Sequence, residues 1–472
     1  MSEVAATLRV DTVVRGGTVV TDRRSERADV LIREGRIAEV IAPGTPVEAS
    51  ETIDAGGLLV LPGLVDPHCH FDTFSHHVDD LTSLSAAAAA GGVTTIIPFL
   101  IPGGRAGQPE TLAEILDHFI EVGEASSLID FGFHVALWPR WEAADEIDAC
   151  AARGCSSFKM FLALPRLGRM VPDDLVFAFM ERIRSVGSLA MVHAENGPVT
   201  DYLETRMRER GETAPTSFAR SRPPILEEEA TFRAICLAAL AEVPLYVVHV
   251  TSAGAARRIA EARASALPVV GETCPQYLTL DEGIMATLGP LAKVAPPLRT
   301  PSDREHLWSA LARGELATIG SDHSGHARAT KERGRDDVFA DVPFGAATIE
   351  TMLRLLVSAG LVEGRLAPER LAALTSANAA RIFGLYPRKG AIEAGSDADL
   401  VLVDPEGEST IDARRHHDRS GYSLYDGWRL RGAVRTVIAG GSVIARDGEI
   451  LDLERRGRYI PRPASGLPEG LS

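Results

Sequence analysis

Residues 58–70 read Leu58-Leu59-Val60-Leu61-Pro62-Gly63-Leu64-Val65-Asp66-Pro67-His68-Cys69-His70, an apolar run that ends in two histidines. The run predicts a buried strand over Leu58 to Asp66, and side chains alternate between the two faces of a strand. We therefore expect His68 and His70 to point the same way and Cys69 the other way. Two imidazoles on one face at a strand end can form half of a metal site, although the pair alone also fits two polar loop residues.

Similar β-rich runs recur along the chain and alternate with helical patterns. Eight strands are predicted, over Leu58 to Asp66, Val93 to Pro98, Ile129 to Leu137, Ser156 to Leu162, Leu189 to His193, Leu245 to Val250, Val269 to Thr273 and Ala317 to Asp322. This alternation is typical of parallel βαβ units, and eight units make a (β/α)8 TIM barrel. A doubly wound open sheet is the alternative, but no Gly-x-Gly-x-x-Gly motif follows the first strand. The sequence therefore predicts an α/β fold with a TIM barrel.

Both ends of the chain carry β-rich runs broken by glycine-containing turn signals. These runs are Leu8 to Val19, Asp29 to Val40, Asp399 to Val403 and Val434 to Val443. Because the termini of a domain often lie close together, we predict one small β-sandwich domain from residues 1–57 and 388–450, beside a TIM-barrel domain over 58–387. The Pro/Gly-rich segment 451–472 is predicted to be an extended arm, which could pack on a neighbouring subunit.

Composition excludes several classes of protein. The 472 residues include 49 basic and 65 acidic side chains, and the net charge of −16 argues against a nucleic-acid partner. The five cysteines are scattered, with no Cys-x-x-Cys spacing, which argues against a disulfide framework. No apolar leader stands at residues 1–10, and no uninterrupted apolar stretch reaches the about 18 residues that a membrane span needs. We therefore expect a cytoplasmic protein with no membrane partner.

Further candidate ligands lie at the ends of later predicted strands. They are Lys159 in the fourth strand, His193 ending the fifth, His249 ending the sixth and Asp322 ending the eighth. Each also has an ordinary structural interpretation: a hydrogen-bonded core histidine, a helix N-cap for Asp322, or a lysine that extends to the surface. Their shared position favours a common site, since the active sites of TIM barrels lie at the C-terminal ends of the strands. A buried ammonium beside metal ions is costly, and carbamylation of Lys159 by CO2 would make it anionic.

These residues resemble the ligand set of the amidohydrolase superfamily, specifically its cyclic amidases: dihydropyrimidinase, hydantoinase, allantoinase and dihydroorotase. The surrounding segments resemble the hydantoinase and dihydropyrimidinase branch. They are Pro62-Gly63-Leu64-Val65-Asp66-Pro67-His68, His193-Ala194-Glu195-Asn196, Glu272-Thr273-Cys274-Pro275-Gln276-Tyr277-Leu278, Pro296-Pro297-Leu298-Arg299 and Gly395-Ser396-Asp397-Ala398-Asp399-Leu400. Later segments resemble L-selective hydantoinases most: Lys293-Val294-Ala295-Pro296-Pro297, residues 320–326 and Tyr422-Ser423-x-Tyr425-Asp426-Gly427.

The resemblance implies a binuclear-metal hydrolase that opens the ring amide bond of a cyclic ureide or imide, of hydantoin or dihydropyrimidine type, by a metal-bound hydroxide. It implies two Zn2+ ions, replaceable by Mn2+ or Co2+. By resemblance, His68, His70 and Asp322 hold one metal, His193 and His249 hold the second, and carbamylated Lys159 (N6-carboxylysine) bridges both. Asp322 would also transfer the proton as the catalytic residue. The relatives further imply a homotetramer or homodimer.

Three other functions remain open at this point. Allantoinase is the alternative within the same class, and a lactonase-type amidohydrolase would keep the metals but change the bond. A non-enzymatic dihydropyrimidinase-related scaffold is the third, although all six metal-site residues are present here.

The expected substrate contacts depart from the family pattern. Leu164 stands five residues after Lys159, where dihydropyrimidinases and many D-hydantoinases have an oxyanion-binding tyrosine. Family members bind the ureide through main-chain groups at positions that correspond to Ala295 and Phe344. His323 could also touch substrate, or it could be a rim residue that is bonded to the backbone.

Overall fold

Ten short parallel strands form the central sheet of the larger part of the molecule, in a computed structural model that describes residues 8–73, 76–103, 111–463 and 467. They are β6 (Leu64–His70), β7 (Val93–Leu100), β8 (Asp130–Phe131), β9 (His134–Ala136), β10 (Ser157–Phe161), β11 (Leu189–His193), β12 (Leu245–Val247), β13 (Val269–Thr273), β14 (Thr318–Ile319) and β15 (His323–Ser324). β14 pairs with β13 and β15 pairs with β6, so the two halves of the eighth strand close the ring. The predicted TIM barrel is confirmed.

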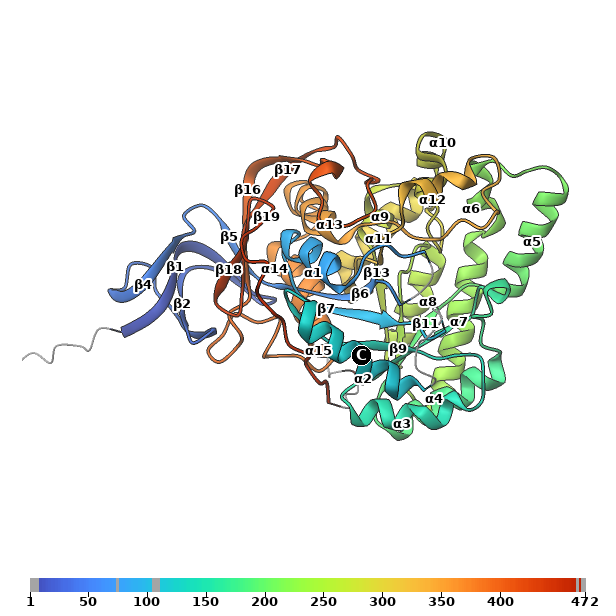
Figure 1. Cartoon of the computed structure of the whole chain (residues 1–472), viewed down its shortest axis with the longest axis horizontal. Helices are drawn as coiled ribbons and strands as arrows, with labels where there is room; N and C mark the ends of the chain where they lie inside the picture. The colour runs from blue at the N-terminus through green and yellow to red at the C-terminus, as the bar shows by residue number, and fades with distance from the viewer. Residues whose placement is uncertain (1–7, 74–75, 104–110, 464–466, 468–472) are drawn as a thin grey trace, which may run out of the picture.

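Helices cover the outside of this ring, as Figure 1 shows for α2, α3, α4 and α7. The helices are α1 (Leu81–Ala90), α2 (Leu112–Ser126), α3 (Ala143–Ala152), α4 (Asp173–Ser185), α5 (Gly197–Glu209), α6 (Phe218–Ser221), α7 (Pro224–Ala241), α8 (Ala253–Ala264), α9 (Pro275–Thr279), α10 (Met285–Leu288), α11 (Pro301–Arg313), α12 (Arg328–Glu332), α13 (Ile349–Leu356), α14 (Pro368–Ala372) and α15 (Asn378–Ile382). Local sequence determines where several begin. Thr111 and Glu114 form a capping box at α2, and the Ser252 side chain accepts from the backbone N–H of Ala255 at α8.

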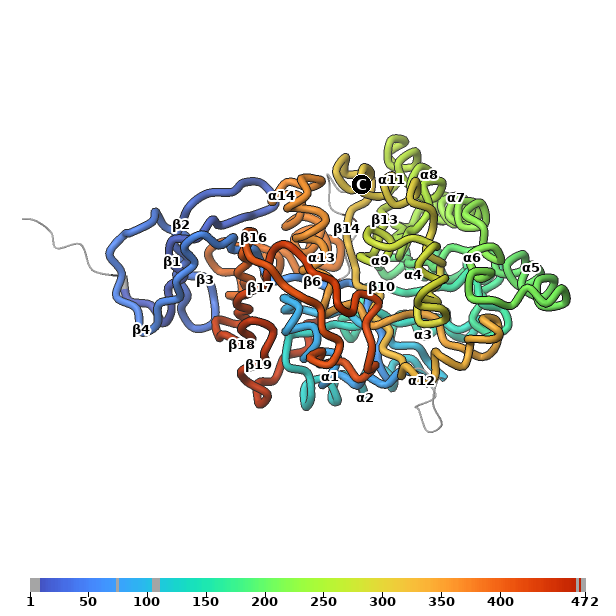
Figure 2. The backbone as a smooth tube through the Cα atoms, turned by 90° about the horizontal axis from the view of Figure 1, so that it is seen from above, coloured from blue at the N-terminus to red at the C-terminus, as the bar shows by residue number. Residues whose placement is uncertain are grey.

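The second sheet contains strands from both ends of the chain, as predicted. Its nine strands are β1 (Leu8–Val20), β2 (Ser25–Arg33), β3 (Arg36–Ile41), β4 (Val47–Asp54), β5 (Leu59–Pro62), β16 (Leu400–Thr410), β17 (Arg429–Ala439), β18 (Ser442–Arg446) and β19 (Glu449–Ile450). β5 and β16 pair antiparallel and so join the N-terminal strands to the C-terminal ones. Val14, Val30, Leu400 and Ile438 share one apolar core. Figures 1 and 2 both show this sheet at one end of the long axis of the molecule.

The apolar run over residues 58–66 is divided between the two sheets. The prediction of one strand is wrong here, because β5 belongs to the terminal sheet and β6 to the barrel. Gly63 lies at the break, where its N–H donates to the carbonyl of Asp399 and a Cβ would lie 2.2 Å from Oγ1 of Thr94. The strand that leads to His68 is therefore tied directly to the terminal sheet.

The segment after β19 packs on the barrel of its own chain. Ile460 N–H donates to Phe131 O at 2.7 Å, and Arg462 N–H donates to Gly154 O at 2.9 Å. The Arg462 side chain is only 1% exposed and donates to Ser157 Oγ on β10. These contacts account for the arm as far as residue 463, while residues 464–466 and 468–472 of the predicted arm lie outside the described residues. No described helix is both long and apolar enough to cross a membrane.

Candidate active site

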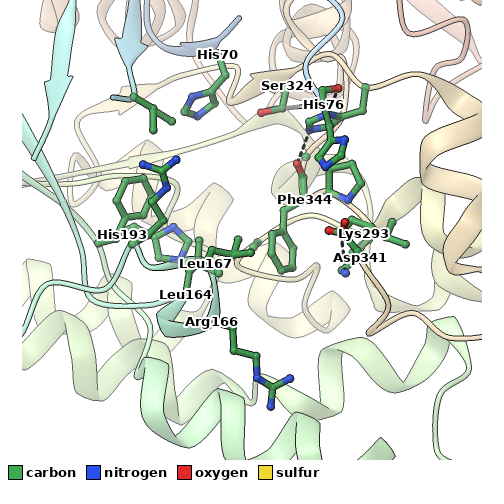
Figure 3. A pocket seen from close by; sticks show the side chains of 18 of the residues that line it. His70, His76, Leu164, Arg166, Leu167, His193, Lys293, Ser324, Asp341 and Phe344 are labelled. Atoms are coloured by element: carbon green, nitrogen blue, oxygen red, sulfur yellow. Dashed lines mark hydrogen bonds between the residues drawn. The ribbon is translucent and has the colours of Figure 1, made fainter. Parts of the chain in front are cut away.

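The six predicted metal-site residues surround one cavity of about 380 Å3 at the C-terminal ends of the barrel strands. β6 supplies two of them, and β10, β11, the segment after β12 and the break between β14 and β15 supply the rest. Together they are His68, His70, Lys159, His193, His249 and Asp322. Figure 3 shows His70 and His193 on one side of this cavity, across from Phe344 and Lys293. The structure thus brings together residues that lie up to 254 positions apart, from His68 to Asp322.

His68, His70 and Asp322 form a close group. Nε2 of His68 lies 3.2 Å from Oδ1 of Asp322, and Nε2 of His70 lies 3.4 Å from the same oxygen. One donor atom from each residue lies within 4.8 Å of the others, a spacing at which one metal ion can bind all three. Asp322 has a left-handed backbone with φ 49°, and its N–H donates to His68 O at 2.8 Å. This conformation, unusual for a residue with a side chain, divides strand eight and is typical of a functional position.

Glu272 on β13 orients the first histidine. Its Oε1 lies 2.6 Å from Nδ1 of His68, and its other oxygen accepts from the hydroxyl of Tyr246 at 2.7 Å. A carboxylate at Nδ1 places the proton there and leaves Nε2 as a lone-pair donor. The sequence pattern alone assigns Glu272 no role, although a charged residue inside the apolar strand Val269 to Thr273 is a usable signal.

His193 and His249 form a second group, with ring centres 4.5 Å apart. Nε2 of His193 lies 2.7 Å from Glu195, and Arg222 donates to the same carboxylate at 3.1 Å. Burial favours a neutral Glu195, but the adjacent Arg222 and His193 outweigh this and lower its pKa to about 2. The anionic Glu195 therefore orients His193 much as Glu272 orients His68, and its position two residues after the candidate ligand His193 was a usable signal in the sequence.

Lys159 lies between aromatic rings rather than beside a counter-ion. It is 2% exposed, and its Nζ is 4.9 Å from the ring centre of Phe99 and 5.3 Å from that of Phe161. No carboxylate in the described part of the chain forms an ion pair with it, and burial lowers its pKa to about 7. Its charge also adds to burial in lowering the pKa of both His70 and His193. Lys159 thus interacts with both groups of histidines.

The donor atoms fit divalent cations. Among the described buried side-chain atoms, Nε2 of His68, Nδ1 of His70 and Nδ1 of His249 have no hydrogen-bond partner. Buried polar atoms are rarely left unpaired, and imidazole nitrogens with one carboxylate suit Zn2+ or similar metals.

Three of the four predicted substrate contacts lie in the lining of the cavity. Leu164, Ala295 and Phe344 line the cavity. Leu164 has φ 64° and precedes the 3-10 turn Pro165–Leu167, which also faces the cavity (Figure 3).

The structure does not bring His323 to the cavity, which corrects the expectation that this side chain could touch substrate. His323 is fully buried, its Nε2 lies 3.2 Å from Asp79, and its Nδ1 accepts from the backbone N–H of Thr348. Both ring nitrogens are therefore engaged inside the protein. His326, three residues later, lines the cavity instead.

Comparison with known proteins agrees with this geometry. Residues 59–444 match the amidohydrolase family model. A D-hydantoinase from Geobacillus stearothermophilus is 38% identical over 466 residues, which span 96% of this chain and 97% of that protein. The crystal structure of dihydropyrimidinase from Brevibacillus agri has a TM-score of 0.91 at 37% identity and covers 97% of this chain and 100% of its own.

An L-hydantoinase (dihydropyrimidinase) from Arthrobacter aurescens is also similar, with a TM-score of 0.91 at 32% identity over 96% of this chain and 100% of its own. Its identity is lower than that of the D-hydantoinase, so the resemblance of later segments to L-selective enzymes stays a prediction. The D-hydantoinase, the dihydropyrimidinase and the L-hydantoinase are all hydrolases of cyclic amides. The chain therefore belongs to the amidohydrolase family, in the branch of hydantoinases and dihydropyrimidinases, and is a hydrolase of cyclic amides.

Proposed function

We propose that the chain hydrolyses a cyclic ureide of hydantoin or dihydropyrimidine type with two bound divalent cations, Zn2+ first, with Mn2+ or Co2+ as substitutes. His68, His70 and Asp322 hold one ion, and His193 and His249 hold the other. Lys159, carbamylated by CO2, would supply oxygen ligands to both ions. The observation that carries this proposal is the convergence of these six side chains on one cavity, with unpaired imidazole nitrogens.

Carbamylation accounts for the environment of Lys159. An ammonium beside two cations in a buried site would be strongly unfavourable. A carbamate replaces the positive charge with a negative one and supplies two oxygens, one for each metal ion. No described carboxylate forms an ion pair with Lys159, and burial outweighs the charges of Glu272 and Asp322 in lowering its pKa, which supports this assignment.

The chemistry divides between the metals and the protein. When bound, the cations polarise the ring carbonyl and make a water molecule nucleophilic near neutral pH. Asp322 accepts a proton from the nucleophile and transfers it to the ring nitrogen that leaves. Its position beside His68 and His70, at 3.2 and 3.4 Å, supports this role. Glu272 and Glu195 keep His68 and His193 in the tautomer that binds metal.

The residues that line the cavity suggest how a ureide would be held and which substituent it would carry. Main-chain groups of Ala295 and Phe344 are proposed to hydrogen-bond the ureide. Leu164, Leu167 and the Phe344 ring supply apolar surface within a lining that also holds charged side chains, and this surface favours an apolar substituent on the ring. From the family resemblance we also propose that the chain assembles as a homotetramer or homodimer. Sedimentation would measure the number of subunits.

A ring-opening assay tests this function. The substrates are hydantoin, both enantiomers of 5-phenylhydantoin, dihydrouracil, allantoin and a simple cyclic imide, with metal content measured on the same samples. We expect turnover of at least one hydantoin or dihydropyrimidine, loss of activity after chelation, and recovery with Zn2+, Mn2+ or Co2+. Turnover of allantoin alone, or full activity without metal, would contradict the proposal.

A further inference from the structure

Four consecutive backbone carbonyls in the cavity wall are bound by buried basic side chains. Residues 342–345 line the cavity, and Figure 3 shows Phe344 across from His70 and His193. Their carbonyl contacts are Lys293 Nζ to Val342 O at 2.9 Å, Lys331 Nζ to Pro343 O at 3.0 Å, His326 Nε2 to Phe344 O at 2.8 Å and Lys331 Nζ to Gly345 O at 2.7 Å. A loop that forms the wall of a binding site is thus held at every carbonyl.

Lys331 is the centre of this arrangement. It is fully buried, on α12, and its third hydrogen bond goes to Lys293 O at 2.7 Å. Three carbonyl acceptors match the three N–H donors of an ammonium group, although burial and the nearby charge of Lys293 both lower the pKa of Lys331. No carboxylate among the described residues pairs with it. Burying an ammonium on carbonyl groups alone is costly, which indicates that the arrangement serves more than stability.

The contacts of Lys331 join two separate segments of the cavity wall. One is Lys293 to Ala295, and the other is Pro343 to Gly345; Gly345 N–H also donates to Lys293 O at 3.0 Å. Lys331 itself does not line the cavity among the described residues. It therefore bonds both segments from outside the cavity, in addition to the direct hydrogen bond between them.

Two residues of the cavity lining have main-chain groups without a partner among the described residues. Within the described part of the chain, Phe344 N–H donates to no protein acceptor, and neither main-chain group of Ala295 has a protein partner. An N–H donor and a main-chain donor–acceptor pair match the alternating C=O and N–H groups of a cyclic ureide.

We propose that Lys331 is a positioning residue for ureide recognition, which sets the spacing between the main-chain groups of Ala295 and Phe344. This inference rests on the proposed function, since it takes the ureide ring as the ligand of these groups. Lys331 acts through the wall and touches no reacting atom. Its effect falls on the ring that all substrates share, and not on the substituent.

Lys331→Met tests the proposal, because it removes three donors and keeps an unbranched side chain of similar length. We expect KM for hydantoin to rise about tenfold or more, as each lost hydrogen bond leaves a buried carbonyl unpaired and shifts the wall. The change in kcat should be smaller. Hydantoin and 5-phenylhydantoin should be affected to the same extent, and the metal content per chain should equal that of the wild type.

Two further variants separate positioning from folding. Trp308→Phe removes one buried donor, to Leu278 O at 2.8 Å, away from the cavity, and should leave KM at the wild-type value. If Lys331→Met does not fold, Lys331→Gln retains two N–H donors and should give a smaller rise in KM. A wild-type KM in the folded Lys331 variant, or a loss explained entirely by missing metal, would overturn the assignment.

Hydrogen exchange tests, without any substrate, whether the hydrogen bonds of Lys331 hold the cavity wall in place. Amides of residues 340–348 should exchange faster in Lys331→Met than in the wild type, whereas peptides from the terminal sheet should not change. If the wild type opens no ureide but this exchange effect is present, the proposed function is wrong, whereas the role of Lys331 in holding the cavity wall is supported. If the wild type is active and the exchange is unchanged, the role of Lys331 fails alone.

Discussion

The carboxylate of Glu272 lies 2.6 Å from Nδ1 of His68, and both side chains are buried at the centre of the barrel. The same carboxylate also accepts from Tyr246 and from the backbone N–H of His249. The Glu272 carboxylate on β13 therefore orients His68, a predicted ligand of one metal. It also bonds the backbone of His249, a predicted ligand of the other metal. The two halves of the site are coupled through this residue.

Glu272→Gln should weaken metal binding by about 10- to 100-fold, because a neutral amide oxygen accepts more weakly from Nδ1–H than a carboxylate and so stabilises less the tautomer of His68 that leaves Nε2 free. Metal bound per chain, measured at graded chelator concentrations, reports the change. Glu350→Gln is the matched control, since Glu350 is also buried but pairs with His417 outside the cavity. Equal metal loss in the two variants would contradict the role of Glu272.

Lys159→Ala should lose most of the bound metal and the activity, because it removes the proposed bridging carbamate. Acetate or propionate at high concentration should restore part of both, since a small carboxylate can occupy the space of the carbamate. Lys389→Ala serves as the control: it removes a buried lysine that pairs with Asp130 and Asp399, away from the cavity, and no carboxylate should rescue it. Unchanged metal content in Lys159→Ala would rule out the bridge.

Leu164→Tyr should raise kcat about tenfold over Leu164→Phe, because the phenol adds a hydrogen-bond donor where charge develops on the substrate oxygen. Both substitutions place an aromatic ring on the same left-handed backbone, so their comparison isolates the hydroxyl. Steady-state kinetics on hydantoin measures the difference. Equal kcat values for the two variants would show that position 164 does not reach the reacting carbonyl.

Asp130 gives stability that depends on pH in the acid range. Burial alone would raise its pKa, but the charge of Lys389, 2.7 Å away, outweighs this and lowers the pKa to about 2. The unfolded chain takes up this proton at higher pH, near the ordinary value of 3.8, so the stabilisation of about 2 kcal/mol is complete above about pH 4 and is lost toward pH 2.

Urea unfolding of Asp130→Asn and wild type at several pH values measures this contribution. The difference in unfolding free energy should be constant between pH 5 and pH 7 and should shrink as the pH falls toward 3. A difference that does not change with pH would mean that Asp130 acts only through its hydrogen bond from Arg458 N–H, 2.9 Å long.

The six candidate ligands could be picked out because each lies in or at the end of a strand in a repeated βαβ pattern. His193 and His249 needed only their place after an apolar run, and the barrel then brought them together. The role of Glu272 could not be predicted, because its partner His68 is 204 positions away and only the closed barrel places them in contact. The prediction that His323 could touch substrate was wrong for the opposite reason. Its position beside Asp322 favoured the cavity, but both of its ring nitrogens are engaged inside the protein, by Asp79 and by the backbone N–H of Thr348.

By itself the sequence determined the class of fold and the six candidate ligands, since hydrophobic periodicity and residue type are local properties. Only the tertiary structure decided which strand continues into which sheet, with β5 and β6 separated at Gly63. It also decided which polar groups are satisfied, as with Lys331 and the four wall carbonyls. The physical reason is that burial and hydrogen-bond pairing depend on contacts between distant segments, which no local pattern encodes.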